Sequence, residues 1–269
     1  MTAVAHQDGE LRQVAKDVWA WVAHSAGWGY SNAGLVRGSR GGLLVDTLYD
    51  LRLTRRMLDA MAPVLGTVPL TDALNTHGNG DHCFGNELLP AATRIHAAPE
   101  AEGTLRAEHP GYMASLRSAD LGPVLGPYVQ ACFGGFHFEE VTLRLPDTAV
   151  TEPTSVDLGG VDVLLLPMGA AHSQGDVVAH IPDAGVLFAG DPLFIGVTPV
   201  MWAGPVANWV RACDRLAALD AEVVVPGHGP LTDQAGIARL GPVRSIFAGP
   251  RRLAPHLAAL SSVAQVRPV

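Results

Sequence analysis

The side chains best suited to chemistry begin in one short segment, residues 75–82, which holds two histidines, an aspartate and two asparagines. Further along, single histidine or aspartate residues stand in glycine-rich turns. Imidazole nitrogen and carboxylate oxygen are ligands that zinc prefers in compact sites. The sequence thus predicts a metal centre, and it offers these candidate ligands: His77, Asp81, His82, His172, Asp191 and His228.

The size of this set favours two ions. Two ions about 3.5–4 Å apart can share a hydroxide and a bridging aspartate, which lowers the pKa of water and polarises the oxygens of a displacement. A smaller set would leave the two coordination shells incomplete. We therefore expect a two-metal hydrolytic site.

The segment His-Gly-Asn-Gly-Asp-His, residues 77–82, resembles the His-x-His-x-Asp-His signature of the metallo-β-lactamase superfamily, with Asn79 in the second histidine position. Residues 32–35 and 42–47 resemble the opening strands of that family. The resemblance continues in order to residue 229 with three later segments: His172 ahead of a strand pair, Asp191 after Leu-Phe-Ala-Gly, and His228 within Val-Pro-Gly-His-Gly.

This resemblance implies an α/β fold, a four-layer αβ/βα sandwich with mixed sheets and with the metals at one rim between them. An amide oxygen is a poorer zinc ligand than imidazole. We therefore expect the first site to be weak or sometimes empty, with Zn²⁺ the expected ion and Mn²⁺ or Fe²⁺ the alternatives. The implied roles are His77, His172 and Asn79 at the first site, Asp81, His82 and His228 at the second, and Asp191 as the bridge.

Short apolar runs bounded by glycines, and two amphipathic segments, predict the elements that hold these residues. We expect the helix over residues 50–61 to stop at Pro63. A second helix is expected over residues 205–219. The expected strands cover residues 14–22, 31–37, 42–46, 73–75, 161–166, 177–181, 186–189 and 222–226.

Residues 97–154 follow a less regular pattern. Residues 100–117 favour a helix interrupted at Pro110, whereas the glycines and prolines of residues 121–128 favour a loop. Aromatic residues then gather at Tyr128, Phe133, Phe136 and Phe138, so this insertion either covers a site for an apolar substrate or packs on itself. We expect one domain over residues 1–269, with a helical tail from about residue 233, broken at Pro242, Pro250 and Pro255.

Composition narrows the class of protein. Hydrophobic residues make up 48% of the chain and charged residues 16%, which is typical of a compact enzyme. The net charge of −8 argues against nucleic-acid binding. The three cysteines are odd in number and suit a reducing cytoplasm, with Cys83 expected as a small buried residue. No apolar run reaches the ~18 residues of a membrane span, so we expect a cytoplasmic protein.

Some polar residues have two interpretations. Asp46 and Asp176 either orient a ligand histidine or cap a turn. The remaining histidines are expected in structural roles: His96, His109, His137, His180 and His256.

The resemblance implies a metal-dependent hydrolase of an ester, thioester or lactone that acts through a metal-bound hydroxide, with Asp81 also steering the proton of the attacking water. The alternative is a cyclase and thioesterase of aromatic polyketide biosynthesis, for which the apolar stretch 121–138, with Trp28 and Tyr30, would suit a flat substrate. Trp202 and Trp209 either contribute to that site or pack a helix. A third, weaker hypothesis is a non-catalytic metal-binding protein. In each enzyme hypothesis the partner is a small apolar or aromatic molecule, and the oligomeric state stays open.

Overall fold

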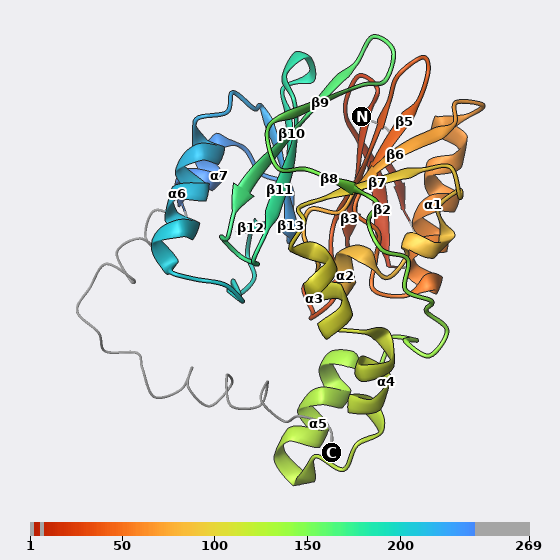
Figure 1. Ribbon diagram of the computed structural model, residues 1–269, viewed down its shortest axis with the longest axis vertical. Helices are drawn as coiled ribbons and strands as arrows, with labels where there is room; N and C mark the ends of the chain where they lie inside the picture. Colours follow the sequence, from red (N-terminus) through yellow and green to blue (C-terminus); the bar gives the residue numbers. More distant parts are fainter. Residues whose placement is uncertain (1–2, 6–7, 240–269) are drawn as a thin grey trace.

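The computed structural model describes residues 3–5 and 8–239, and these form two sheets packed face to face with helices on both outer surfaces (Figure 1). Helix α1 (Leu51–Leu65) covers the first sheet, and helices α6 (Val206–Ala217) and α7 (Gln234–Arg239) cover the second. Because each sheet mixes parallel and antiparallel pairs, the predicted four-layer αβ/βα sandwich with mixed sheets is confirmed.

The first sheet follows the chain order from β1 to β8. Its first five strands pair antiparallel, and β5 to β8 pair parallel. Parallel pairing places the carboxyl ends of β5, β6 and β7 at one edge, where the residues of the predicted metal centre begin. The strands are β1 (Ala3–Ala5), β2 (Gly9–Ala15), β3 (Val18–Ala23), β4 (Ala33–Arg37), β5 (Gly42–Val45), β6 (Leu70–Leu74), β7 (Arg94–Ala97) and β8 (Thr148–Ala149).

The second sheet has the order β13-β12-β11-β10-β9, and only β12 and β13 are parallel neighbours. All six residues of β11 and all nine of β12 are buried, as expected for central strands covered on both faces. The strands are β9 (Thr154–Asp157), β10 (Asp162–Gly169), β11 (Asp176–Ile181), β12 (Val186–Phe194) and β13 (Val223–His228).

The two-residue period of the strands divides the core into layers. In β5, Leu43 and Val45 face the second sheet, whereas Leu44 faces α1 and packs near Met57. The face of α6 that carries Trp209 closes the second sheet from outside. Apolar packing on both faces therefore fixes the strands and leaves their ends to carry the polar residues.

Three predictions of secondary structure are wrong. Residues 14–22 do not form one strand, because β2 ends at Ala15 and β3 begins at Val18, with Asp17 at positive φ in the turn between them. Helix α1 continues past Pro63 and ends at Gly66, which has a φ of 62°. A proline in the last turn removes one backbone hydrogen bond, and the left-handed glycine provides the actual stop. Residues 121–128 are not a loop, because α5 spans Gly122–Phe133. Pro123 stands in its first turn, where a missing N–H is tolerated.

The insertion consists of α3 (Ala101–Ala107), α4 (Pro110–Ser118) and α5, and it extends from the sandwich beside α2 (Gly80–Cys83) (Figure 1). Two short 3-10 helices, Asn86–Leu88 and Pro182–Ala184, complete the described elements. No helix in the described ranges is long and apolar enough to cross a membrane. The predicted tail beyond residue 239, with its three prolines and His256, lies outside the described residues.

Candidate metal centre

All six predicted ligand residues lie together at one end of the sandwich. His77 follows β6, while Asp81 and His82 belong to α2. His172 lies in the loop between β10 and β11. Asp191 is within β12, and His228 is the last residue of β13. Four separate segments therefore meet, each within a strand or directly connected to one.

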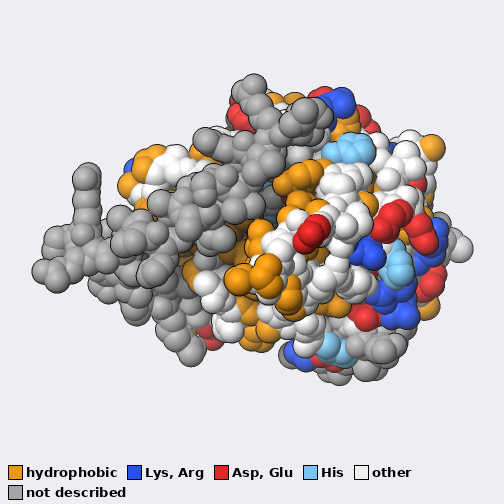
Figure 2. Space-filling model, turned by 90° about the horizontal axis from the view of Figure 1, so that it is seen from below, with side chains coloured by type: hydrophobic (Ala, Val, Ile, Leu, Met, Phe, Trp, Pro, Cys, Tyr) orange, Lys and Arg blue, Asp and Glu red, His pale blue; other side chains and the backbone are white. Residues whose placement is uncertain are grey.

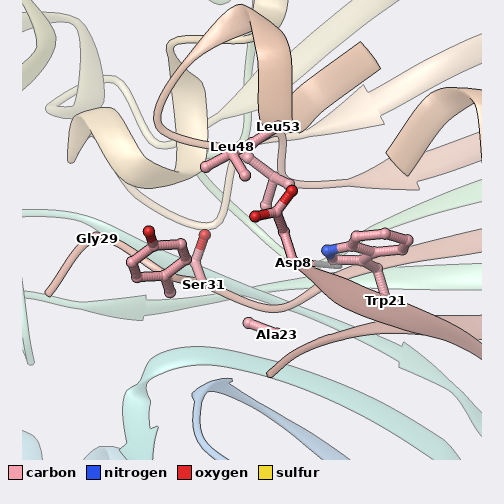
Figure 3. A pocket seen from close by; sticks show the side chains of 8 residues that line it. Asp8, Trp21, Ala23, Gly29, Ser31, Leu48 and Leu53 are labelled. Carbon is pink, nitrogen blue, oxygen red and sulfur yellow. The ribbon is translucent and has the colours of Figure 1, made fainter. Parts of the chain in front are cut away.

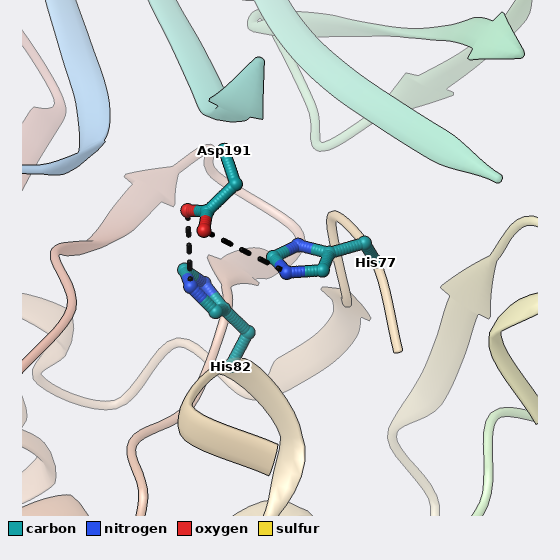
Figure 4. Close-up of side chains that lie close together, drawn as sticks. All are labelled: His77, His82 and Asp191. Carbon is teal, nitrogen blue, oxygen red and sulfur yellow. Dashed lines mark ion pairs between the residues drawn. The ribbon is translucent and has the colours of Figure 1, made fainter. Parts of the chain in front are cut away.

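Asp191 is the centre of the cluster. Its carboxylate lies within 4 Å of the Nε2 atom of every histidine in the set. Figure 4 shows it pointing between His77 and His82. The distances to Nε2 are 3.2 Å for His82, 3.3 Å for His228, 3.5 Å for His172 and 3.9 Å for His77. A second carboxylate, Asp81, places Oδ2 3.4 Å from His228 Nε2 and 3.8 Å from His82 Nε2.

The Nδ1 atom of each imidazole is hydrogen-bonded, which fixes the tautomer of the ring and leaves Nε2 facing the cluster. A backbone carbonyl can only accept, so His172 and His228 must carry a proton on Nδ1. The Thr76 hydroxyl already donates to Asp46, and its oxygen is left to accept from His77. The Nδ1 partners are Thr76 Oγ1 for His77 (3.1 Å), Asp46 Oδ2 for His82 (2.9 Å), Val200 O for His172 (2.8 Å) and Tyr30 O for His228 (3.0 Å).

These anchors leave four Nε2 lone pairs converging on one volume. The Nε2 atoms of His82 and His228 are only 3.4 Å apart, so two acceptors would face each other without a proton or a cation between them. Among the described residues, His77 Nε2 has no hydrogen-bond partner, although it is fully buried. Uncompensated buried lone pairs are unfavourable unless a proton or a cation lies between them. The donor set of nitrogen and carboxylate oxygen therefore fits divalent metal ions.

The electrostatics of the cluster show the same demand for positive charge. Burial opposes a charge on His228, yet Asp191 and Asp81 together raise the pKa of its imidazole to about 10. Burial likewise opposes ionisation of Asp191, but His228 and His82 hold the pKa of this carboxyl well below its usual value. Burial and the neighbouring His82 keep the pKa of His77 well below its usual value. The pKa of His82 is raised, mainly by Asp191 acting against burial.

The structure decides the two open interpretations of the buried aspartates. Asp46 accepts from His82 Nδ1 and from the backbone N–H of Thr76, so it orients a ligand histidine. Asp176 instead accepts from the N–H groups of Ala171 and Ser173, and so it closes the turn that carries His172.

Other candidate residues lie outside the cluster. Cys83 is buried and donates its S–H to His77 O (3.0 Å), which supports the loop. His96 is paired with Asp72 at 2.7 Å, and His109 accepts from Gly111 N at the start of α4. His180 is buried in β11, while His137 is exposed. Of the aromatic residues considered for the substrate site, Trp209 packs in the core and donates Nε1–H to Pro192 O.

Asn79 faces the cluster through its amide oxygen, which lies 3.1 Å from His172 Nε2. Its amide nitrogen donates to Oε2 of Glu108 (2.9 Å), a residue that the sequence analysis missed. Glu108 follows α3 in a stretch without clear pattern, and nothing in its spacing connects it to residues 77–82. Burial, and then the nearby Asp81, raises the pKa of this carboxyl to about 7.

Exposed aromatic side chains stand beside the segments that anchor the ligands. Trp202, 60% exposed, donates its backbone N–H to His172 O (2.8 Å). Trp28, 42% exposed, lies two residues before Tyr30, and its ring contacts Phe133 of the insertion. Tyr128 of α5 is 50% exposed and hydrogen-bonded to Trp28. Viewed from the end that carries α5, hydrophobic side chains gather across the middle of the molecule (Figure 2).

A small cavity is lined by residues that include Ser31 and Leu48 (Figure 3). Its volume is about 10 Å³, which suffices for about one water molecule. It is too small for a substrate. The lining residues are Asp8, Trp21, Ala23, Gly29, Tyr30, Ser31, Leu48 and Leu53.

Relatives and solved structures resemble this chain over most of its length. The acyl-coenzyme A thioesterase MBLAC2 of Gallus gallus is 29% identical over 208 residues, which cover 74% of this chain and 72% of the thioesterase. The 2,4-dinitroanisole O-demethylase subunit alpha of a Nocardioides strain is 24% identical over 72% of this chain and 51% of that protein. A metallo-beta-lactamase structure from Erythrobacter litoralis has a TM-score of 0.66 at 19% identity, covering 91% of this chain and all of that one.

The fold and the converging histidines and aspartates define a metal-dependent hydrolase of the αβ/βα type. More specifically, the profile of the metallo-beta-lactamase superfamily matches residues 26–228, and the chain belongs to that superfamily. It is an enzyme of this family, whose fold implies a divalent metal ion.

Proposed function

We propose that the protein hydrolyses thioesters of apolar acyl groups with the help of two zinc ions. The observation that carries this proposal is the convergence of four imidazole Nε2 atoms on Asp191, beside a rim of exposed aromatic rings. The resemblance to an acyl-coenzyme A thioesterase supports the thioester as the bond that is cleaved. Sequence identity of 29% leaves the acyl group and the thiol to be determined by experiment.

The donor set divides into two halves around Asp191. The first half comprises His77, His172 and the amide oxygen of Asn79. The second half comprises Asp81, His82 and His228. Divalent ions held there supply Lewis acidity, which lowers the pKa of water and polarises a carbonyl oxygen.

Asp81 is the proposed proton acceptor. Burial disfavours its charge, yet His82 and His228 lower the pKa of this carboxyl, so it is ionised at neutral pH. Its side chain is 14% exposed, whereas those of His77 and His82 are fully buried. Of these three side chains, the carboxylate is the one that remains partly accessible from outside, and it can accept a proton from an attacking water.

The rim supports an apolar acyl group. Trp202 and Trp28 expose large ring surfaces near His172 and Tyr30, and such surfaces are stabilised when apolar substrate atoms cover them. Transfer of each methylene group from water to such a surface contributes about 0.8 kcal/mol. Longer acyl chains should therefore be better substrates.

To test the proposal, the zinc-loaded full chain is incubated with acyl-coenzyme A thioesters of increasing chain length and with the matching N-acetylcysteamine thioesters. Release of free thiol is measured. We expect turnover that a chelator abolishes and that zinc restores, with kcat/KM rising roughly threefold to fourfold per added methylene. Equal rates for both thiols would indicate that the acyl group alone is recognised. Absence of thiol release across the series would refute the proposal.

Asn79 favours one rival, the cyclase and thioesterase reaction on a poly-β-ketone. A neutral amide in place of an imidazole makes the first half a weaker zinc site, and an aromatic rim suits a flat substrate. Mass analysis of a poly-β-ketone thioester separates the reactions. Loss of water without chain cleavage supports cyclisation, whereas a released acid supports hydrolysis.

A further inference from the structure

Glu108 binds both Asn79 and the start of the ligand helix. Its Oε2 accepts from Asn79 Nδ2 (2.9 Å) and from the backbone N–H of Gly80 (3.0 Å). Its Oε1 accepts from the hydroxyl of Tyr49 (3.0 Å). Three hydrogen bonds thus hold this carboxylate beside the first half of the metal centre, although it does not lie among the groups that could hold an ion.

The surroundings of Glu108 make it a rigid support. Tyr49 is buried and its ring packs against Phe136 and Phe138, with centroids 4.9 Å away in each case. At the other end of α3, a Cβ on Gly78 would lie 2.4 Å from Ala101 O. Helix α3 is therefore fixed to the loop of residues 77–80 at both ends.

The partners of Glu108 determine which way the Asn79 amide faces. The N–H of Gly80 can only donate, so Oε2 is an acceptor and must face the amide nitrogen of Asn79. The amide oxygen is thereby turned towards His172 Nε2, 3.1 Å away. His172 carries its proton on Nδ1, which donates to Val200 O. The Nε2 lone pair of His172 and the amide oxygen of Asn79 thus point at each other across the first half.

We propose that Glu108 is a positioning residue that presents the Asn79 oxygen to the ion in the first half. The inference deepens the proposed function, since it assumes the same metal centre. Glu108 acts through Asn79 rather than as a ligand, because both of its oxygens are already engaged in hydrogen bonds. A histidine ligand is oriented by the hydrogen bond of its own Nδ1 atom. The Asn79 amide is oriented instead by its hydrogen bond to Glu108.

The test measures metal affinity without any substrate. Zn²⁺ and Co²⁺ affinities of both halves are measured by chelator competition in the full chain, for Glu108→Ala, Glu108→Gln and the parent protein. We expect Glu108→Ala to weaken the first half by roughly 10-fold to 100-fold, with the second half nearly unchanged. Glu108→Gln keeps an acceptor for Asn79 and Gly80, so its affinities should lie within about threefold of the parent.

A double-mutant cycle shows whether Glu108 acts through Asn79 or stabilises the surrounding fold in general. In an Asn79→Ala background, Glu108→Ala should cause no further loss of first-half affinity. An equal loss in both backgrounds would overturn the inference, as would a loss in Glu108→Gln as large as in Glu108→Ala. Should Glu108→Ala fail to fold, Tyr49→Phe removes one of the three bonds while keeping the ring, and it should weaken only the first half. If the coupling holds but no thiol is released, the substrate proposal alone fails.

Discussion

The two halves of the metal centre use the same kind of imidazole but differ in what completes the set. In the second half, Asp81, His82 and His228 supply a carboxylate and two imidazoles, and Asp46 and the Tyr30 carbonyl fix the rings. In the first half, two imidazoles are joined by a neutral amide whose direction depends on Glu108. The imidazoles of both halves are thus anchored outside the insertion, whereas the Asn79 amide of the first half depends on it.

We infer that the asparagine at position 79, where the signature that this segment resembles has a histidine, depends on Glu108 for its orientation. Asn79 alone would be a poor substitute, since an amide can rotate and offer its N–H groups instead. Glu108 and the Gly80 N–H together exclude that orientation. We therefore expect the two halves to differ in metal affinity and in how they respond to substitution.

The largest effect is expected from Asp191→Ala, because this carboxylate contacts all four histidines. Its removal should weaken metal binding in both halves, so that their affinities no longer differ. We expect zinc content to fall towards zero and kcat/KM to fall by roughly 10³-fold or more. Metal analysis and thioester turnover measure these losses. An unchanged rate would rule out Asp191 as the shared residue.

Asp46→Asn should weaken the second half selectively. Asp46 has a left-handed backbone with a φ of 61°, which asparagine tolerates, so the turn is kept. The variant weakens the acceptor that holds His82 Nδ1, and loss of such a partner lowers metal affinity by roughly 10-fold to 100-fold. Chelator competition measures both halves. Asp176→Asn is the matched control, since Asp176 caps a turn and should affect the first half only through His172.

Proton release on metal binding should differ between the halves. In the metal-free protein the pKa of His228 is about 10, so its Nε2 carries a proton at pH 7 that a metal must displace. Affinity at the second half should rise about tenfold per pH unit for each proton displaced, up to about pH 10. His77 has a lowered pKa and no proton to lose. Calorimetry in buffers of different ionisation enthalpy counts the protons.

The same shift predicts a pH dependence of stability without metal. Because the folded pKa of His228 is raised, its stabilising proton is fully present below the unfolded value of about 6.5. That contribution is lost as the pH rises towards 10. The thermal midpoint of the metal-free protein should therefore fall over this range, and the fall should be smaller in His228→Ala, because the pKa of His82 is raised as well.

Asn79→His should make the halves more alike. An imidazole is a better zinc ligand than an amide oxygen, so zinc affinity at the first half should rise by roughly tenfold. The second half serves as the internal control. Unchanged stoichiometry and affinity would mean that residue 79 does not face the first ion.

Much of this architecture can be predicted from the sequence. The six ligand candidates need only residue type, order and glycine-rich context, because strand ends are rigid platforms for such loops. Glu108 could not be predicted, since its connection to Asn79 exists only after α3 packs on Gly78. Helix α5 was missed for a related reason. Its glycines and prolines argue locally for a loop, whereas two prolines that fall in and near the first turn interrupt little of its hydrogen bonding.

The smallest effect is expected at the rim, where Trp202 and Trp209 make a matched pair. Trp202 is 60% exposed beside His172, so Trp202→Ala should leave folding and both metal affinities unchanged. We expect it to raise KM for long-chain thioesters by roughly threefold to tenfold, with little change in kcat, because it removes apolar contact area but no ligand. Trp209 of α6, 8% exposed, packs against the second sheet, and Trp209→Ala should instead lower the free energy of unfolding by about 3–5 kcal/mol. Chain-length profiles and denaturant titrations of both variants test this contrast. If Trp202→Ala changed KM equally for short and long acyl chains, the rim would not contact the acyl group.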